Sequence, residues 1–323
     1  MCAFTISLPK VTSVTDKNTK IVKPGRKTWK DALLGSGLPL EYSVAQILKE
    51  FDSGLQQEYQ YMRPNEHGIP TQFSVDQYVN LFPTQDQFVE LFIESKYRRD
   101  GTQWLFSPQS SSFTNDFSFR ETLTYLDAFS DVGKVNHEAV HRFLNGYMGA
   151  VKGVEIQNDQ PNPQSIERGI AQLKYAISAE IPVCFEHQLD HLLGKQSPIF
   201  ILLPVLVTTA QLWRLKEGTT IDLIRSAGNL SDIGDQLDVL FLCITPDNML
   251  QEYTRKKLQA FFEARKNDHA ESILRGRGQN VRFHIDHVST AHPTLFVIVH
   301  LSKLRRVVGD FVTFFQNPDF IVK

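Results

Sequence analysis

Hydrophobic and polar residues alternate in three consecutive segments of the N-terminal part of the chain. The alternation covers Gly54–Pro64, Thr71–Val79 and Phe88–Ile93, and Asn65-Glu66-His67-Gly68 supplies turn chemistry between the first two. Before these segments, apolar positions between Pro39 and Phe51 recur at helical spacing. The pattern therefore predicts a helix followed by three strands, of which the first two form a hairpin.

The rest of the chain mixes helical and strand patterns. Ile199–Thr209 is a continuous apolar run, which is typical of a strand buried on both faces. Residues 1–27 lack a clear period and are interpreted as an arm, and residues 109–119 as a loop. We expect an α/β protein with one elaborated domain, its core about 28–216 and a C-terminal extension about 217–323. Further helical patterns lie at 136–148, 165–177, 220–225, 249–265 and 304–315, and further strand patterns at 211–215, 239–244, 281–287 and 293–300.

Charged residues interrupt the second and third predicted strands. Glu94 and Lys96 are two positions apart, so the period of a strand places both side chains on one face. Asp76 follows the apolar run of the neighbouring strand, and pairing of the two strands would bring its carboxylate toward Glu94. Because two close carboxylates repel each other, a divalent cation that prefers oxygen ligands would stabilise them. The expected ion is Mg²⁺ or Mn²⁺.

The order helix, strand, strand with Asp76, strand with Glu94-x-Lys96 resembles the PD-(D/E)XK, or restriction-endonuclease-like, nuclease superfamily. The resemblance implies a core of a helix, a three-stranded antiparallel meander, a second helix and a further strand. It also implies that the acids bind Mg²⁺ and that Glu41, in the first turn of the predicted helix, belongs to the site. On its own, an acid in a first helical turn commonly only favours the helix dipole. The chain departs from the motif at Val75, where the motif has proline.

Two residues of the helix predicted at 165–177 extend this resemblance. Gln172 and Tyr175 are similar to the Gln and Tyr that some superfamily members carry on the helix after the Glu-x-Lys strand. The other interpretation is an ordinary helix surface. Both residues are therefore candidates, Gln172 for the catalytic site and Tyr175 for nucleic-acid binding.

The resemblance implies a metal-dependent nuclease that hydrolyses the phosphodiester bonds of nucleic acid, with DNA as the expected substrate and RNA as the alternative, and with a tendency toward defence against foreign DNA. Asp76 and Glu94, with the carbonyl of Ser95, would bind the ion that activates water. Lys96 would position or deprotonate that water and stabilise the charged phosphate. Glu41 would hold a second ion or a metal-bound water.

Basic and aromatic residues near these segments are candidates for contacts with nucleic acid. Arg98, Arg99 and Trp104 follow the Glu-x-Lys strand, where they would suit phosphate and base contacts. Arg275 and Arg277 lie where residues 253–282 carry eight Lys or Arg against three acids. They could follow a phosphate backbone. The alternatives are a charged turn with Trp104 in the core and a solvated basic surface.

Composition narrows the cellular setting. The formal net charge of −2 gives no overall attraction to nucleic acid, so any attraction must be local. Cys2, Cys184 and Cys243 lack metal or redox spacing, which favours a reduced compartment and argues against zinc. The longest apolar run, Pro198 to Val207, is too short for a membrane helix, and the N-terminus lacks a signal-peptide pattern. We expect a cytoplasmic protein without membrane contact.

Two other functions stay open. The chain could be a non-catalytic nucleic-acid-binding subunit of a larger complex. His137-Glu138-Ala139-Val140-His141 also matches the His-Glu-x-x-His pattern of zinc peptidases, although no third ligand is evident. A homodimer would match the two strands of a duplex, and a partner protein is the other association to consider.

Overall fold

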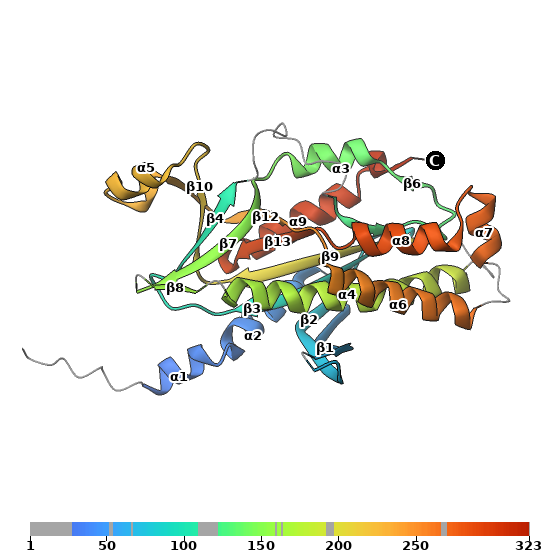
Figure 1. The fold of residues 1–323 in the computed structure, drawn as a ribbon, viewed down its shortest axis with the longest axis horizontal. Helices are drawn as coiled ribbons and strands as arrows, with labels where there is room; N and C mark the ends of the chain where they lie inside the picture. Colours follow the sequence, from blue (N-terminus) through green and yellow to red (C-terminus); the bar gives the residue numbers. More distant parts are fainter. Residues whose placement is uncertain are drawn as a thin grey trace, which may run out of the picture.

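A large mixed sheet runs through the protein, with helices on both of its faces (Figure 1). This arrangement confirms the expected α/β class. In the sheet the strands are ordered β1-β2-β3-β9-β13-β12-β7-β4-β10-β11, and β5 and β8 pair with β9 and β7. The computed structural model describes residues 28–51, 54–65, 67–108, 122–158, 160–162, 164–191, 197–265 and 270–322.

The elements have the following bounds. The helices are α1 (Trp29–Gly35), α2 (Leu38–Leu48), α3 (His137–Leu144), α4 (Gln164–His191), α5 (Ile221–Ser226), α6 (Asn248–Ala264), α7 (Ala270–Gly276), α8 (Val281–Ala291) and α9 (Leu304–Phe315). The strands are β1 (Gly54–Pro64), β2 (Pro70–Thr84), β3 (Gln87–Lys96), β4 (Gln103–Pro108), β5 (Thr124–Leu126), β6 (Lys134–Val135), β7 (Gly149–Gln157), β8 (Gln160–Asn162), β9 (Ile199–Thr208), β10 (Gln211–Leu215), β11 (Gly234–Leu237), β12 (Val239–Cys243), β13 (Leu295–His300) and β14 (Ile321–Val322).

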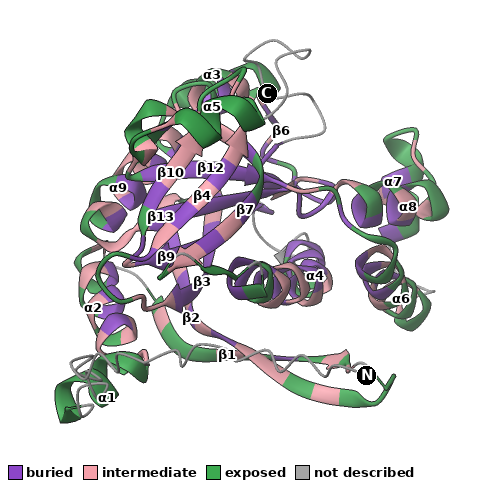
Figure 2. Ribbon diagram, turned by 60° about the vertical axis from the view of Figure 1, so that its left-hand side comes forward, coloured by how far each residue is buried: buried purple, intermediate pink, exposed green. Residues whose placement is uncertain are grey.

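The first three strands form an antiparallel meander at one edge of the sheet, as the alternating pattern predicts. The hairpin β1–β2 extends beyond the sheet as a long two-stranded ribbon (Figure 2). Next to β3 lies β9, parallel to it and in register along its full length. Every residue of β9 is buried, which is why this strand reads as one continuous apolar run.

Each face of the sheet has its own hydrophobic core. One core joins the sheet to α4, α6, α7 and α8, and the other joins it to α2, α3 and α9. In Figure 2 the first group lies to the right of the sheet, and α2 and α9 of the second group lie to its left. The helix α4 begins near β7 and β8 and passes across β3 and β9, so its residues meet the end of the meander.

Residues 281–287, which we expected to form a strand, are instead the start of α8. The side chain of Asn280 caps this helix by accepting a hydrogen bond from the backbone N–H of Phe283. The buried residues Ile285 and Val288 are three apart, which fits one face of a helix. The strand interpretation was wrong because Val281, Phe283 and Ile285 alternate with polar residues over a short segment and the cap was overlooked.

Several other segments follow the pattern closely. The strands β10, β12 and β13 and the helices α5, α6 and α9 fall where the sequence predicts them, and α4 continues past the expected end at residue 177, through Pro182, to His191. The expected N-terminal arm and the loop at 109–119 lie outside the described residues. Of the helices that the structure describes, none combines the length and the apolar character that crossing a bilayer would require.

Candidate metal centre

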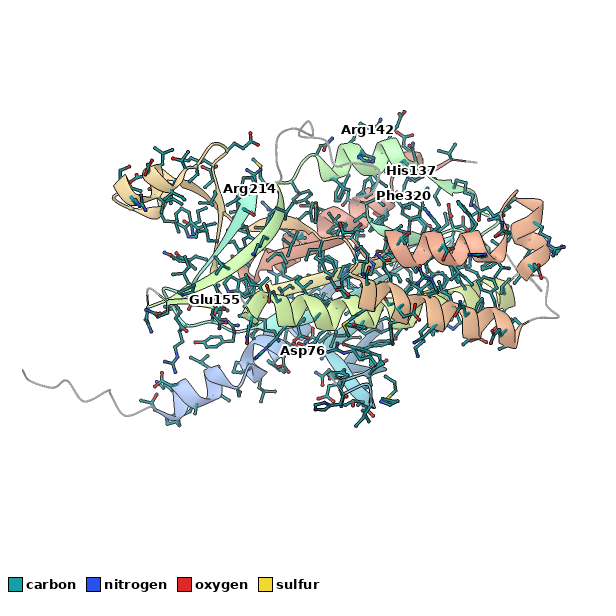
Figure 3. The ribbon with its side chains drawn as sticks, viewed as in Figure 1. Asp76, His137, Arg142, Glu155, Arg214 and Phe320 are labelled. Atoms are coloured by element: carbon teal, nitrogen blue, oxygen red, sulfur yellow. The ribbon has the colours of Figure 1, made fainter. Side chains whose placement is uncertain are left out.

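The two acids singled out by the sequence come together on β2 and β3. The register pairs Gln77 with Ile93, which sets Asp76 beside Glu94 and Ser95. The Oδ2 atom of Asp76, labelled in Figure 3, accepts a hydrogen bond of 2.6 Å from the backbone N–H of Ser95. The strand pairing therefore fixes the aspartate carboxylate against the strand that carries Glu94.

Lys96 connects this strand to α4. Its Nζ atom forms an ion pair with Oε1 of Glu94 and lies 3.4 Å from Oε1 of Gln172. The amide of Gln172 in turn donates to the carbonyl of Ser74 on β2, and its backbone carbonyl accepts from the Tyr61 hydroxyl at 2.9 Å. Gln172 thus joins the lysine to both strands of the hairpin.

Close approach of α4 to β3 depends on Gly169. A Cβ atom at this position would lie 2.9 Å from Cδ1 of Leu206, 3.4 Å from Cε of Lys96 and 3.6 Å from Cγ of Glu94. Real Cβ atoms essentially never come as close as the first of these distances. Glycine therefore allows the helix to lie directly over the polar residues of β3.

Burial leaves the carboxylates of this site poorly compensated. Glu94 is only 2% exposed, and burial, followed by the nearby Asp76, raises the pKa of Glu94 to about 7. Burial also raises the pKa of Asp76. The second oxygen of Glu94, Oε2, has no hydrogen-bond partner in the described part of the chain. A buried carboxylate oxygen without a donor is costly, and a cation would remove that cost.

Glu41 approaches the same site from α2. The amide of Gln77 donates to the backbone carbonyl of Glu41, which fixes this helix against β2. Burial raises the pKa of Glu41, and the charges of Asp76 and Glu58 raise it further. The contribution of Asp76 to this shift is consistent with the predicted place of Glu41 near the site.

Glu58 is a further acid of this cluster, and sequence reasoning missed it. The pairs Gln57–Gln77 and Tyr59–Val75 flank it, so Glu58 lies opposite Asp76 on β1. Its φ is 57°, a conformation that non-glycine residues rarely adopt and that is often found at functional sites. Its charge raises the pKa of both Asp76 and Glu41.

Near Glu58 the side chains of the hairpin switch from one face of the sheet to the other, which explains why the sequence pattern did not reveal this residue. Leu55 packs against the core of α2 and α9, whereas Tyr59 packs against the core of α4. On β2, Val75 and Val79 likewise belong to opposite cores. Residues four apart share a face in a regular strand. A uniform alternation therefore predicts the wrong face of the strand for the Glu58 side chain. The break in the apolar pattern between the two cores is the sequence feature that could have revealed its position.

The donor set of the cluster fits a hard divalent cation. Asp76, Glu94 and Glu41 offer carboxylate oxygens, which Mg²⁺ and Mn²⁺ prefer. The ligand oxygens of the three acids do not all lie within 4.8 Å of one another. Among the described residues, one group of three potential ligand atoms is that compact, namely Glu90, Glu180 and Cys184. Within that part of the chain, no thiolate or imidazole, the ligands that zinc favours, therefore forms such a group with the three acids.

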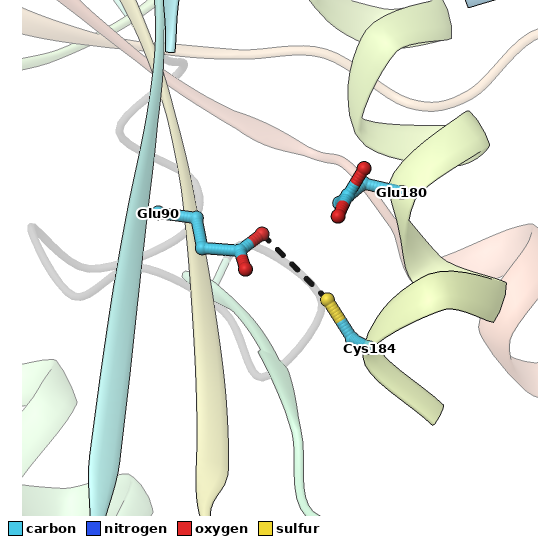
Figure 4. A group of neighbouring side chains, drawn as sticks. All are labelled: Glu90, Glu180 and Cys184. Carbon is cyan, nitrogen blue, oxygen red and sulfur yellow. Dashed lines mark hydrogen bonds between the residues drawn. The ribbon is translucent and has the colours of Figure 1, made fainter. Parts of the chain in front are cut away.

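The cluster of Glu90, Glu180 and Cys184 is fully buried between β3 and α4 (Figure 4). The Cys184 thiol donates to Oε2 of Glu90 at 3.6 Å, and the Tyr59 hydroxyl donates to Glu180. Burial raises the pKa of Glu90 to about 8, which favours its protonated form near neutral pH, and burial also raises the pKa of Glu180. Neutral groups with hydroxyl and thiol donors satisfy one another without a metal.

Two of the predicted nucleic-acid contacts instead bind other residues of the fold. Trp104 on β4 is completely buried, and its Nε1–H donates to Glu155 at 2.9 Å. Arg98 forms an ion pair with the same glutamate, which Figure 3 labels on β7. The structure therefore contradicts an exposed Trp104 and a free Arg98, because both stabilise the start of α4 through Glu155 and Ser165. Arg99 remains exposed beside the turn that follows β3.

The remaining predicted contacts lie in two places. Arg277 donates to the backbone carbonyls of Asp127, Ala128 and Ser130, so it joins segments of the fold and is not available to phosphate. Arg275 is exposed and pairs with Glu271 on α7, at the end of the molecule beyond the C-terminal half of α4 (Figure 1). Tyr175, in contrast, lies one turn from Gln172.

The His-Glu-x-x-His pattern does form a helix, α3, but the described residues provide no third ligand for it. The ring of His137, labelled in Figure 3, is hydrogen-bonded to the Tyr125 hydroxyl at 3.0 Å. No group of three ligand atoms that the structure describes includes His137, Glu138 or His141. The geometry therefore does not favour a zinc peptidase.

Comparisons with known proteins found no match to a protein-family model, to a curated protein or to a solved structure.

Proposed function

We propose that the protein is a Mg²⁺- or Mn²⁺-dependent nuclease that hydrolyses phosphodiester bonds of DNA. The observation that carries this proposal is the convergence of Asp76, Glu94 and Lys96 with Gln172. These residues come from two adjacent strands and a helix and are connected by the hydrogen bonds of Ser95 and Lys96. Carboxylates beside a lysine, with one buried oxygen lacking a donor among the described residues, are suited to binding a cation next to a phosphate.

The order of the elements around the site supports a restriction-endonuclease-like core. Such a core needs a helix, an antiparallel meander, a second helix and a strand, and α2, β1–β2–β3, α4 and β9 follow in that order. The strand β9 pairs parallel to β3, beside the strand that carries Glu94. Between β3 and α4 the chain inserts β4, β5, β7 and β8, which extend the sheet, and α3 and β6, of which β6 pairs with β14 in a separate two-stranded sheet.

Each side chain has a role that follows from its position. A Mg²⁺ or Mn²⁺ ion held by Asp76 and Glu94 would lower the pKa of an attacking water and neutralise charge on the scissile phosphate. Lys96, which is partly exposed, would donate to a phosphate oxygen and hold the water in line. Gln172 positions the lysine. Glu41 would orient a second ion or a metal-bound water.

A cleavage assay tests the proposal directly. The protein is incubated with supercoiled DNA, linear DNA, single-stranded DNA and RNA, with Mg²⁺, with Mn²⁺ and with a chelator. We expect metal-dependent cleavage of DNA that is lost in Asp76→Asn, a substitution that keeps the shape of the side chain. Asp222→Asn on α5, whose exposed carboxylate is remote from the site, serves as the matched control.

The outcomes separate the nuclease from the other functions. Equal cleavage by wild-type protein and Asp76→Asn would show that the activity comes from another site or a contaminant. Binding of DNA without metal-dependent products would favour a non-catalytic subunit. Tightly held zinc that is lost in His137→Ala would favour a peptidase.

A further inference from the structure

A shallow cavity of about 230 Å³ lies between the outer part of the hairpin and α6. Its described lining residues include Arg63 of β1 and Lys256 and Lys257 of α6, and no Asp or Glu is among them. The Tyr253 hydroxyl donates to the backbone carbonyl of Met62 at 2.7 Å, which fastens α6 to β1 at this point. The cavity therefore has a fixed wall on each side, and three cationic side chains border a lining that is mostly apolar.

The cations of this cavity are only weakly neutralised by the protein. The Arg63 guanidinium is sandwiched between the rings of Phe73 and Tyr175, at 4.0 and 4.4 Å, and forms no ion pair within the described residues. Its Nε atom is buried and has no hydrogen-bond partner among them. Lys257 lies over the Tyr253 ring, and Lys256 pairs with the exposed Glu252. Aromatic stacking orients Arg63 but leaves hydrogen-bond donors for an anion.

The cavity lies on the same strand as the candidate metal centre. Arg63 follows Glu58 by five residues on β1, which corresponds to about 17 Å at the rise of a strand. A duplex carries one phosphate per about 3.4 Å of axis on each strand, so this distance spans roughly five nucleotides. Tyr175, which stacks on Arg63, lies one turn from Gln172 on α4. One strand and one helix thus connect the two sites.

We propose that this cavity binds a backbone phosphate of the nucleic-acid strand whose scissile phosphate lies at the metal centre. The inference rests on the proposed nuclease function. Arg63 and Lys257 contact the phosphate, and Lys256 adds long-range attraction. Between the cavity and the metal centre, the nucleic-acid strand lies along the hairpin. Binding here is independent of sequence, because these contacts reach the backbone and no base edge.

Binding measurements with charge-deleting variants test this inference. The variant Lys256→Met/Lys257→Met removes two charges but keeps the aliphatic stems, and Arg225→Met/Lys303→Met, on exposed residues elsewhere, removes the same charge as a control. Binding of a labelled duplex is measured by fluorescence anisotropy at several salt concentrations in a chelator. We expect about tenfold weaker binding and a salt slope lower by roughly 1 for the first variant only. Arg63→Met, if it folds, should lose binding similarly.

Cleavage and competition experiments distinguish this inference from the nuclease proposal. The loss of affinity in Lys256→Met/Lys257→Met is measured in a chelator, so it does not depend on whether the protein cleaves. Equal affinity and equal salt slope for this variant and its control would overturn the inference while leaving the nuclease intact. Wild-type protein that binds but never cleaves would overturn the nuclease alone. Competition by inorganic phosphate as strong as that by the duplex would overturn a strand as the ligand, and a wild-type protein that binds no duplex would overturn it as well.

Discussion

The interface of β3 and α4 contains two polar clusters that differ in how their buried carboxyl groups are stabilised. Glu94 and Glu90 lie four residues apart on the strand, and Gln172 and Glu180 lie eight apart on the helix. The cluster at Glu94 contains a lysine and a buried oxygen without a partner among the described residues, whereas the cluster at Glu90 contains tyrosine and thiol donors. A tight group of potential ligands is therefore not by itself a metal site. A charged, incompletely satisfied group next to a cationic side chain is the better indication.

The largest expected difference between the clusters is catalytic. Lys96→Met should lower the cleavage rate by about 10³-fold or more, since it removes the group that stabilises charge on the phosphate. Glu90→Gln, on the same strand but more deeply buried, should cleave like wild type because a neutral carboxyl and an amide are similar in shape. Single-turnover rates of the two variants measure the contrast. Comparable losses in both would mean that the buried cluster takes part in the reaction.

A larger side chain between α4 and β3 should displace groups of the candidate metal centre more than those of the buried Glu90 cluster. Gly169→Val places a branched side chain against Leu206 and Lys96, so we expect a loss of about 1–3 kcal/mol in the free energy of unfolding. A displacement of catalytic groups by ~1 Å can lower the rate by about 10²-fold. Urea unfolding and cleavage are measured together, with Ala179→Val on the same helix as a control. An unchanged rate would show that the helix does not position Lys96.

Glu58 should contribute modestly to the same centre. Because its carboxylate lies opposite Asp76, Glu58→Gln should weaken activation by Mg²⁺ by about tenfold while leaving the fold unchanged. The concentration of Mg²⁺ at half-maximal cleavage measures this effect, and Glu252→Gln on the exposed face of α6 provides the comparison. If both variants need the same Mg²⁺ concentration as wild type, Glu58 has no part in ion binding.

The buried cluster at Glu90 should make the free energy of unfolding depend on pH. Burial raises the pKa of Glu90 from 4.5 to about 8, so the folded protein holds this proton more tightly than the unfolded chain. That contribution is fully present below pH 4.5 and is lost as pH rises through about 8. The unfolding free energy of wild type relative to Glu90→Gln should therefore fall between these limits. Urea titrations at several pH values measure the difference, and a constant difference would contradict a protonated Glu90.

The smallest effect is expected from the thiol. Cys184→Ala removes one weak donor to Glu90 and leaves a small cavity, so we expect a loss of about 1 kcal/mol in unfolding free energy and no change in bound metal. Urea unfolding and elemental analysis of the purified protein and its variant provide the measurements. Zinc that is bound by wild type and lost in the variant would make this cluster a metal site.

The sequence predicts much of the fold and the central part of the site because both depend on local patterns. The alternation of β1 to β3 and the apolar run of β9 reveal the strands, and the Glu94-x-Lys96 spacing follows from the period of a strand. What it cannot show depends on packing between distant segments. The sequence leaves Trp104 available to a ligand, but Glu155, 51 residues later, accepts its hydrogen bond in the interior. The change of faces in the hairpin concealed Glu58 for the same reason.

The position of β12 and β13 has a consequence for dissecting the protein. These strands come from the C-terminal extension, yet they lie between β9 and β7 in the middle of the sheet. A fragment that ends near residue 216 would contain every residue of the candidate centre but would lack the strands that connect its two halves. It would also expose the apolar edge of β9, which is prone to aggregate. Attempts to isolate a minimal fragment that contains the candidate centre should therefore retain the C-terminal strands and shorten the chain elsewhere.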